Sequence, residues 1–289
     1  MDINLYKTHP IYFAISIQIL KKILDCNKTL SQYIFADGGT LIGIHRYGEY
    51  GIMPWDDDID IGIIANNDII IELINNCLHN NLTIVVHLKK NINKSFYDNT
   101  FRTVHITLSL SESQTNIPLN DRNIISFDEL KENIDNMAFF NISIKEELYI
   151  EILKKNNLYD VIELEYYDKI NKKHLIVPWI DFFPFDFNNV YVKYNHYFGA
   201  TTLQKQESYN GILFMGFNIV KFHNIDINIF INSIDYLCDL YGDDILNTIE
   251  IYGSHNNPLK NKIKIINSNE IINYVKKYNN QIKYYNIFL

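Results

Sequence analysis

The sequence predicts a mixed α/β fold, of the α+β type, in one domain over residues 1–289. Isoleucines recur at helical spacing near the N-terminus, whereas 82–88 and 101–110 are apolar runs of strand length. No internal repeat or Pro- and Gly-rich linker divides the chain. With 289 residues, of which 47% are apolar, the chain can bury a full hydrophobic core.

The expected elements follow the order of the chain. A helix over 11–24 presents an apolar stripe made of Ile11, Ile15, Ile19 and Ile23. Asn67 and Asp68 are candidate caps of a second helix, which runs to about His79. The remaining expected elements are strands at 82–88, 101–110 and 174–186, helices at about 144–155 and 228–241, and a short helix in the tail after Leu259.

The composition excludes some partners and compartments. The net charge is −8, whereas proteins that grip nucleic acid through its phosphates usually carry a basic excess, so we expect no nucleic-acid partner. The apolar stretch 11–24 is too short, and too rich in polar residues, to span a membrane. Three widely spaced cysteines indicate reduced thiols, as in a cytoplasmic protein, in the host cytoplasm if the gene is viral.

The most informative segment holds four aspartates, Asp56, Asp57, Asp58 and Asp60. From Asp58 onward, isoleucines alternate with Asp58, Asp60 and Gly62. On a strand, this alternation places Asp58 and Asp60 on the face opposite the isoleucines, with Cα atoms roughly 7 Å apart. Two carboxylates at that spacing can hold one small cation, which would relieve their repulsion. Asp57 is expected to point away from this pair.

Three other interpretations of the acidic segment deserve comparison. A solvated acidic turn and a structural ion site without catalysis both remain open. An EF-hand loop is excluded, because Ile61 occupies the position that requires Gly and Asn67 the position that requires Glu.

A glycine turn precedes the acidic segment. Gly38, Gly39 and Thr40 are expected at the start of a short helix, where backbone N–H groups can approach a phosphate closely. Arg46 lies between this turn and the acidic strand, and its planar guanidinium could hold a phosphate. A tight turn and a surface ion pair are the corresponding structural alternatives.

The stretch GGTLIGIHRYGEYGIMPWDDDIDIGI resembles the signature of the LicD/fukutin family. That signature typically reads Gly-Thr-Leu-Leu-Gly, then Arg, then Ile-Pro-Trp-Asp-Asp-Asp-Ile-Asp. Two later segments, PWIDFFPFD and YLCDLYGDD, resemble the family's second and third blocks. The resemblance covers about 10–245, with an apparent insertion at about 90–170, and leaves a Lys-rich tail at 259–289.

The resemblance implies a nucleotidyltransferase-like mixed sheet flanked by helices. It further implies transfer of a phospho-alcohol, such as phosphocholine or ribitol phosphate, from a CDP-activated donor to a glycan hydroxyl. By position, the catalytic carboxylates are Asp58, Asp60 and Asp181, which would hold Mg²⁺ or Mn²⁺ with Asp56 as a further ligand. The donor phosphates would lie on Gly38, Gly39 and Thr40, with Arg46 beside them.

Two alternatives to this function remain. In the first, the same fold transfers a nucleotide from an NTP to a protein, an RNA or a small molecule. In the second, the chain is a non-catalytic binding protein with a degenerate site.

Overall fold

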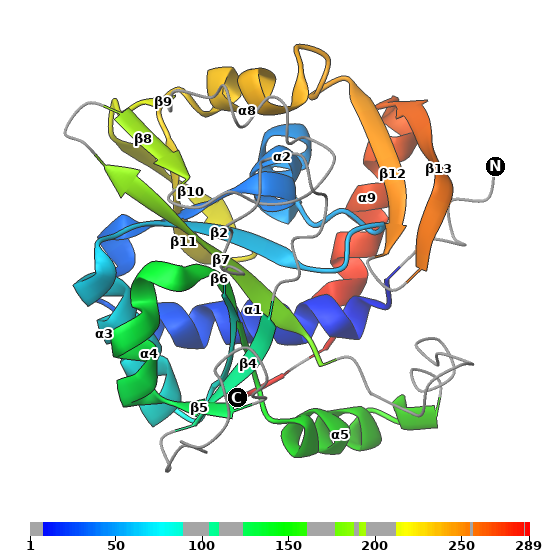
Figure 1. Ribbon diagram of the computed structural model, residues 1–289. Coiled ribbons are helices and arrows are strands. Elements are labelled where there is room, and N and C mark those ends of the chain that lie inside the picture. Colours follow the sequence, from blue (N-terminus) through cyan, green and yellow to red (C-terminus); the bar gives the residue numbers. More distant parts are fainter. Residues whose placement is uncertain are drawn as a thin grey trace.

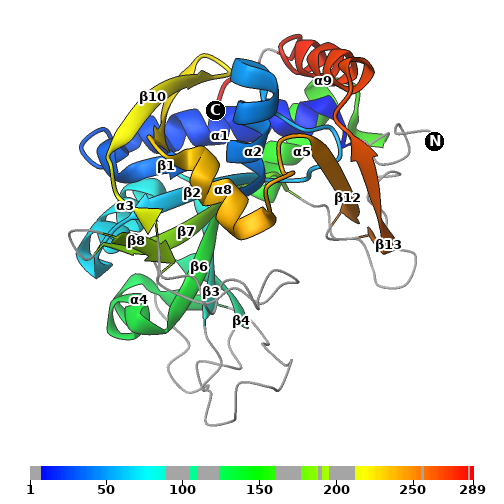
Figure 2. The same ribbon diagram turned by 90° about the horizontal axis from the view of Figure 1, so that it is seen from above.

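The computed structural model describes residues 8–88, 104–109, 124–160, 177–187, 191–194, 212–254, 257–285 and 287–289. The main sheet contains, in spatial order, β10 (Phe217–Phe222), β11 (Ile225–Phe230), β1 (Ile34–Ala36), β2 (Ile59–Ile64), β7 (Trp179–Phe187), β6 (Met137–Ser143), β3 (Thr83–Leu88), β4 (Val104–Ser109) and β5 (Ile124–Ser126). Figure 2 shows the order from β1 to β4 across the molecule.

Further strands extend the sheet or stand apart from it. Two short strands continue from β7, namely β8 (Tyr191–Tyr194) and β9 (Ile212–Leu213). A separate hairpin consists of β12 (Thr248–Ser254) and β13 (Asn257–Ile266). The pairs β1–β11, β2–β7 and β4–β5 are parallel, and the other pairs are antiparallel. The expected mixed α/β fold is therefore confirmed.

Helices lie on both sides of the sheet. They are α1 (Pro10–Cys26), α2 (Gly38–Tyr47), α3 (Asn67–His79), α4 (Phe127–Asn133), α5 (Glu146–Lys155), α8 (Ser233–Tyr241) and α9 (Asn269–Ile282). In Figure 1, α1 and α3 lie below β2, whereas α2 and α8 lie above it. The apolar face of the central strands packs toward α1, and the face that carries the aspartates is directed to the other side.

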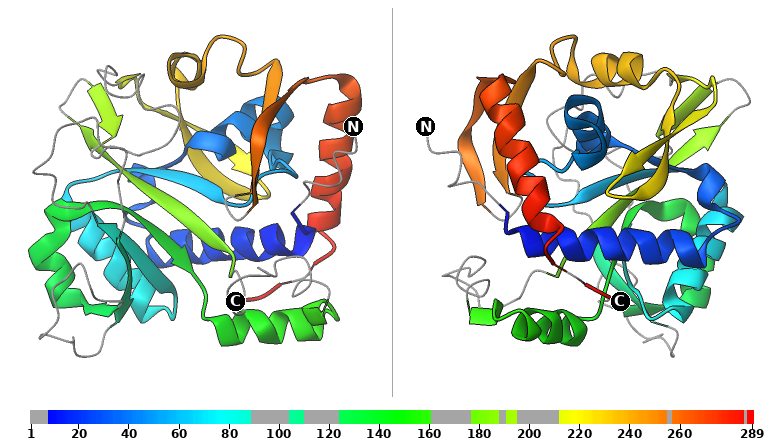
Figure 3. Two further views of the ribbon diagram at one scale, coloured as in Figure 1. Left: turned by 45° about the vertical axis from the view of Figure 1, so that its right-hand side comes forward. Right: turned by 180° about the vertical axis from the view of Figure 1, so that it is seen from behind.

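The first helix is enclosed on more sides than its isoleucine stripe predicted. α1 contacts β6 and β7, and it also contacts α3 and α9. Figure 3 shows α9 crossing the N-terminal end of α1. Tyr12, Phe13 and Ser16 are consequently buried together with the stripe. The hydroxyl of Tyr278 in α9 donates to the carbonyl of Thr8 over 2.7 Å, which ties α9 to the segment just before α1.

The C-terminal tail is more ordered than expected. Instead of ending in one short helix, it forms β13 and the 14-residue helix α9. Ser268 caps α9, because its side chain accepts from the N–H of Ile271. The side chain of Asn279 is fully buried and hydrogen-bonds to the N–H and the carbonyl of Ile52. Ile52 lies in the segment that leads to the acidic strand. The tail therefore belongs to the core of the domain.

The described residues of the region 90–170 take part in the main sheet, because β6 lies between β7 and β3. One expectation about a helix requires correction. The expected helix 228–241 begins only at Ser233, since residues 225–230 form β11. Ile225, Ile227 and Ile229 alternate at the strand period and are buried, which favours a strand between β1 and β10.

Pro184 does not end the strand in which it lies. β7 continues to Phe187, because β6 pairs with residues 179–182 and β8 with residues 185–187. Pro184 falls between these two partners, where no ladder hydrogen bond to its nitrogen is needed on that side. The cap of α3 is also one residue earlier than expected, at Asn66.

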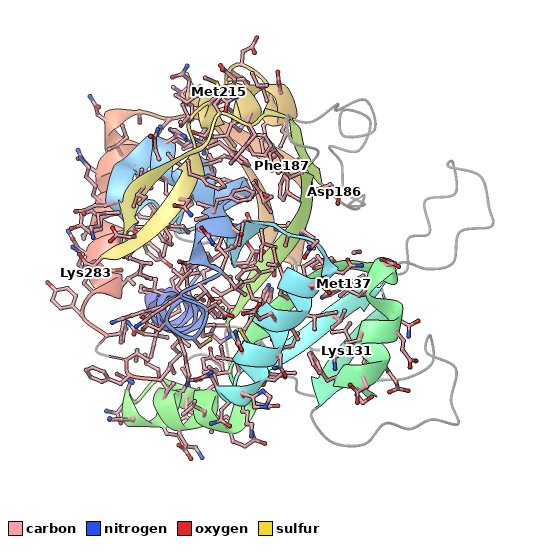
Figure 4. All side chains as sticks on the ribbon, turned by 90° about the vertical axis from the view of Figure 1, so that its left-hand side faces the viewer. Lys131, Met137, Asp186, Phe187, Met215 and Lys283 are labelled. Atoms are coloured by element: carbon pink, nitrogen blue, oxygen red, sulfur yellow. The ribbon has the colours of Figure 1, made fainter. Side chains whose placement is uncertain are left out.

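Exposed apolar side chains gather at the end of β7. Phe187 is 44% exposed, and Met215, after β9, is 56% exposed. Figure 4 shows both residues on the same side of the molecule, away from Lys131. Phe187 packs edge-on against Phe214, with ring centroids 5.2 Å apart. This aromatic contact links the exposed patch to the core.

Candidate active site and metal centre

The parallel pairing of β2 with β7 places two aspartates side by side. Asp60 lies opposite Asp181 in the register of this pair, and opposed residues on neighbouring strands point to the same face. Ile59 and Ile61 point to the other face and are buried. The alternation predicted from the sequence is therefore present, and the fold adds Asp181 as the direct neighbour of Asp60.

The three predicted catalytic carboxylates converge. One carboxylate oxygen from each of Asp58, Asp60 and Asp181 can be chosen so that all three lie within 4.8 Å of one another. Asp58 is 8% exposed and Asp181 is 9% exposed, so water relieves little of their charge. A set of close, buried oxygen ligands is the donor chemistry that Mg²⁺ and Mn²⁺ prefer.

The pKa shifts of these carboxyls also indicate a site for a cation. Burial, followed by repulsion from Asp60 and Asp181, raises the pKa of Asp58 well above its ordinary value. Burial, followed by repulsion from Asp56 and Asp181, does the same to the pKa of Asp60. A divalent cation would reverse both effects, because it favours the charged form of each carboxylate. These residues therefore fit a divalent metal ion.

Asp56 and Asp57 form a second group with Asp58. Oxygens of these three side chains also lie within 4.8 Å of one another, so Asp57 does not point away as expected. Asp56 belongs to this group and not to the group around Asp181. Thr8 fixes the segment in place, because its N–H donates to the carbonyl of Pro54 and its hydroxyl donates to the carbonyl of Asp56 over 2.6 Å.

The glycine turn lies directly against the acidic strand. α2 begins at Gly38, as the sequence predicted, and the N–H of Gly39 donates to Oδ2 of Asp60 over 2.6 Å. The hydroxyl of Thr40 accepts from the N–H of Asp60 over 2.9 Å. A Cβ atom on Gly39 would lie 2.6 Å from Oδ2 of Asp56. In this structure the turn thus holds the carboxylate of Asp60, and a Cβ atom at Gly38 or Gly39 would displace Asp60 or Asp56.

Arg46 faces backbone carbonyls. Its Nε and Nη2 donate to the carbonyl of Ile245, and Nη2 also donates to the carbonyl of Thr248. Its Nη1 lies 3.5 Å from the sulfur of Met53. The guanidinium thus joins α2 to residues 245–248, where β12 begins, and its expected contact with a phosphate stays a prediction.

Four residues near the site were not predicted from the sequence. Asn141 of β6 donates from Nδ2 to Oδ1 of Asp181 and bonds through Oδ1 to Nε2 of His87 in β3. Asp37, fully buried at the start of α2, accepts from the hydroxyl of Tyr236 over 2.7 Å. Asn141 and His87 lie in ordinary apolar stretches, whereas Asp37 precedes the glycine turn and Tyr236 begins the segment YLCDLYGDD. Strand pairing and helix packing bring these side chains to the aspartates.

Part of the chain matches a known protein family. Residues 32–140 match the family described as LicD/FKTN/FKRP, nucleotidyltransferase domain. Residues 32–140 belong to the LicD family. The matched region contains the glycine turn, Arg46, the acidic segment and His87, whereas Asn141 and Asp181 lie beyond it. A search of curated proteins found no significant match.

Membership of the LicD family gives the general class of activity. LicD-family enzymes are transferases of phosphorus-containing groups in glycan or polysaccharide modification, and they typically depend on a metal ion. Clustered carboxylates that could bind such an ion are present here. Among the described residues, no helix has the length and apolar character needed to cross a bilayer.

Proposed function

We propose that this LicD-family protein transfers a phospho-alcohol from a CDP-activated donor to a glycan hydroxyl. Phosphocholine and ribitol phosphate are the kinds of group that it would move. The observation that carries the proposal is the convergence of Asp58, Asp60 and Asp181 beside the glycine turn. Phosphoryl transfer requires positioning and neutralisation of charge more than covalent chemistry, and this arrangement can supply both.

The residues have separate roles in this proposal. Asp58, Asp60 and Asp181 would hold Mg²⁺ or Mn²⁺, with Asp56 as a further ligand beside Asp58. When bound, the ion would neutralise charge on the pyrophosphate of the donor. Gly39 and Thr40 hold Asp60 in place, and the N-terminus of α2 offers a favourable dipole for an anion at the turn.

The reaction itself exchanges one phosphorus–oxygen bond for another. The acceptor hydroxyl oxygen attacks the phosphorus that bears the alcohol and forms a new P–O bond. The bond from that phosphorus to the bridging oxygen breaks, and CMP leaves with the electron pair. The hydroxyl proton passes to a base, for which Asp181 is the candidate if it does not complete the metal site.

CMP release tests the proposal directly. The purified protein would be incubated with CDP-choline, CDP-ribitol or CDP-glycerol and candidate glycans, in Mg²⁺ or Mn²⁺, and CMP would be measured. We expect CMP only with a suitable donor and metal ion. Asp60→Asn should abolish it, whereas Asp239→Asn, at an exposed position of α8, should leave it unchanged.

The alternative functions give different products. Labelled NTPs would release pyrophosphate if the protein transferred a nucleotide, and that result without CMP release would replace our proposal. Absence of binding of Mg²⁺ and Mn²⁺ in calorimetry, with no product from any donor, would favour a non-catalytic protein.

A further inference from the structure

A row of polar side chains crosses the sheet behind Asp181. Asn141 lies opposite Asp181 in the β6–β7 register, and His87 is the diagonal neighbour of Asn141 on β3. Opposed and diagonal positions of this kind share one face, which is also the face of Asp60. Hydrogen bonds join the row from His87 to Asn141 and from Asn141 to Asp181.

The donor and acceptor groups of this row fix the direction of its hydrogen bonds. An ionised carboxylate only accepts hydrogen bonds, so Asn141 must turn its NH₂ group toward Asp181. Its carbonyl oxygen then faces His87, whose Nε2 must carry a proton to donate. A reversed amide would place its oxygen against the carboxylate. His87 therefore selects the orientation of the amide that holds Asp181.

The position of His87 is itself fixed by packing. Its ring stacks on Phe139, with centroids 3.7 Å apart and an angle of 12° between the ring planes. Phe139 in turn stacks on Phe183, at 6.0 Å. His87 is 3% exposed, so water cannot readily replace its N–H as the partner of Asn141.

We propose that Asn141 and His87 are positioning residues for Asp181. The amide of Asn141 holds Asp181 by a hydrogen bond to its Oδ1, and His87 prevents the amide from rotating. The inference rests on the proposed function, because it assigns these residues to the same metal site. Groups that hold a metal ligand in this way usually change metal affinity about 10–100-fold when they are removed.

Two substitutions of His87 separate hydrogen bonding from packing. His87→Phe keeps a ring on Phe139 but removes the N–H, whereas His87→Gln keeps an N–H donor but removes the ring. If the row acts through its hydrogen bonds, His87→Phe should impair the site and His87→Gln should largely preserve it. A purely structural role of His87 in packing would give the opposite order.

The measurement is Mn²⁺ affinity of the full chain by calorimetry, with thermal unfolding to confirm that each variant folds. We expect Asn141→Leu and His87→Phe to weaken Asp60-dependent Mn²⁺ binding by about 10-fold or more, and His87→Gln to bind like the unmodified protein. Equal affinity in all three variants would overturn the positioning role, as would weaker binding by His87→Gln than by His87→Phe.

The Mn²⁺-binding experiment and the CMP-release experiment test different claims and can fail independently. If the affinities follow the expected order but no CDP-alcohol releases CMP, the positioning role stands and the proposed reaction fails. If CMP is released and the affinities do not follow that order, only the positioning role fails. Absence of any Asp60-dependent Mn²⁺ binding would overturn both.

Discussion

Gly39 donates its backbone N–H to the carboxylate of Asp60 over 2.6 Å. The glycine turn and the acidic strand, which are separate motifs in the sequence, are therefore parts of one site. The turn cannot move without changing the position of a candidate metal ligand. The same contact explains why the first two residues of α2 have no side chains, because Cβ atoms there would meet Asp56 and Asp60.

Replacement of a metal-site aspartate should stabilise the metal-free protein. Folding raises the pKa of Asp58 and of Asp60, so the metal-free protein loses stability as pH rises above the ordinary carboxyl range. Asp58→Asn removes a carboxyl that folding must bury, either as a repelled charge or after protonation. In EDTA we expect a higher Tm, by about 2–4 °C for each kcal/mol regained.

Mg²⁺ should reverse the order of stability in this comparison. The ion should raise the Tm of the unmodified protein, because it binds the folded state, but not that of Asp58→Asn. Asp239→Asn should behave like the unmodified protein in both conditions. A lower Tm for Asp58→Asn in EDTA would show that repulsion does not dominate at this position.

Two glycines with positive φ provide a matched test of the turn. Gly38 has φ +44° and Gly48 has φ +72°, so alanine introduces strain of about 1–2 kcal/mol at both positions. Only at Gly38 would the new Cβ meet the carboxylate of Asp60, because nothing lies within 4 Å at Gly48. We expect both variants to lose stability and Gly38→Ala alone to lose turnover, by about 100-fold. Equal turnover in the two variants would contradict this role of the turn.

His223 should make the protein less stable in acid. Burial lowers its pKa to about 4, while its Nε2 lies 2.9 Å from Oδ1 of the buried Asn279. Lys283 also lowers this pKa, and Glu49 opposes the shift. Because the unfolded chain binds this proton near pH 6.5, stability is lost as pH falls from 6.5 to 4, by up to about 3 kcal/mol.

Comparison with a variant shows whether His223 causes this loss of stability in acid. Urea unfolding from pH 7 to 4 would be compared between the unmodified protein and His223→Gln, which keeps an N–H donor but does not titrate. We expect the free energy of unfolding to fall less steeply in the variant, since all other groups are shared. Parallel curves would exclude His223 as the source.

Arg46→Gln should lower the stability of the protein but have little effect on binding of the donor. The guanidinium donates to the carbonyls of Ile245 and Thr248, and hydrogen bonds from a charged group contribute about 1.5–3 kcal/mol each. We expect a loss in that range in chemical unfolding, with little change in the KM for the donor at a temperature where the variant is folded. A large rise in KM would instead assign Arg46 to the donor phosphates.

The acidic strand and the glycine turn could be predicted from the sequence because each depends only on neighbouring residues. Alternation in Asp58–Ile63 indicated the strand and the shared face of Asp58 and Asp60, and Gly38 indicated the turn into α2. Strand period and backbone freedom are properties of short segments, so a sequence reports them directly. The predicted helix 228–241 wrongly included residues 228–230, which end β11, since a short apolar run fits either period.

By itself the sequence determined the mixed α/β class, the acidic strand and the glycine turn. Tertiary structure decided which distant residues meet them. The β2–β7 register brings Asp181 to Asp60, and β6 and β3 add Asn141 and His87 behind it. In the folded protein Arg46 also meets the carbonyls of Ile245 and Thr248, where β12 begins. Partners of this kind follow from strand order and register across the whole chain, and no local pattern encodes them.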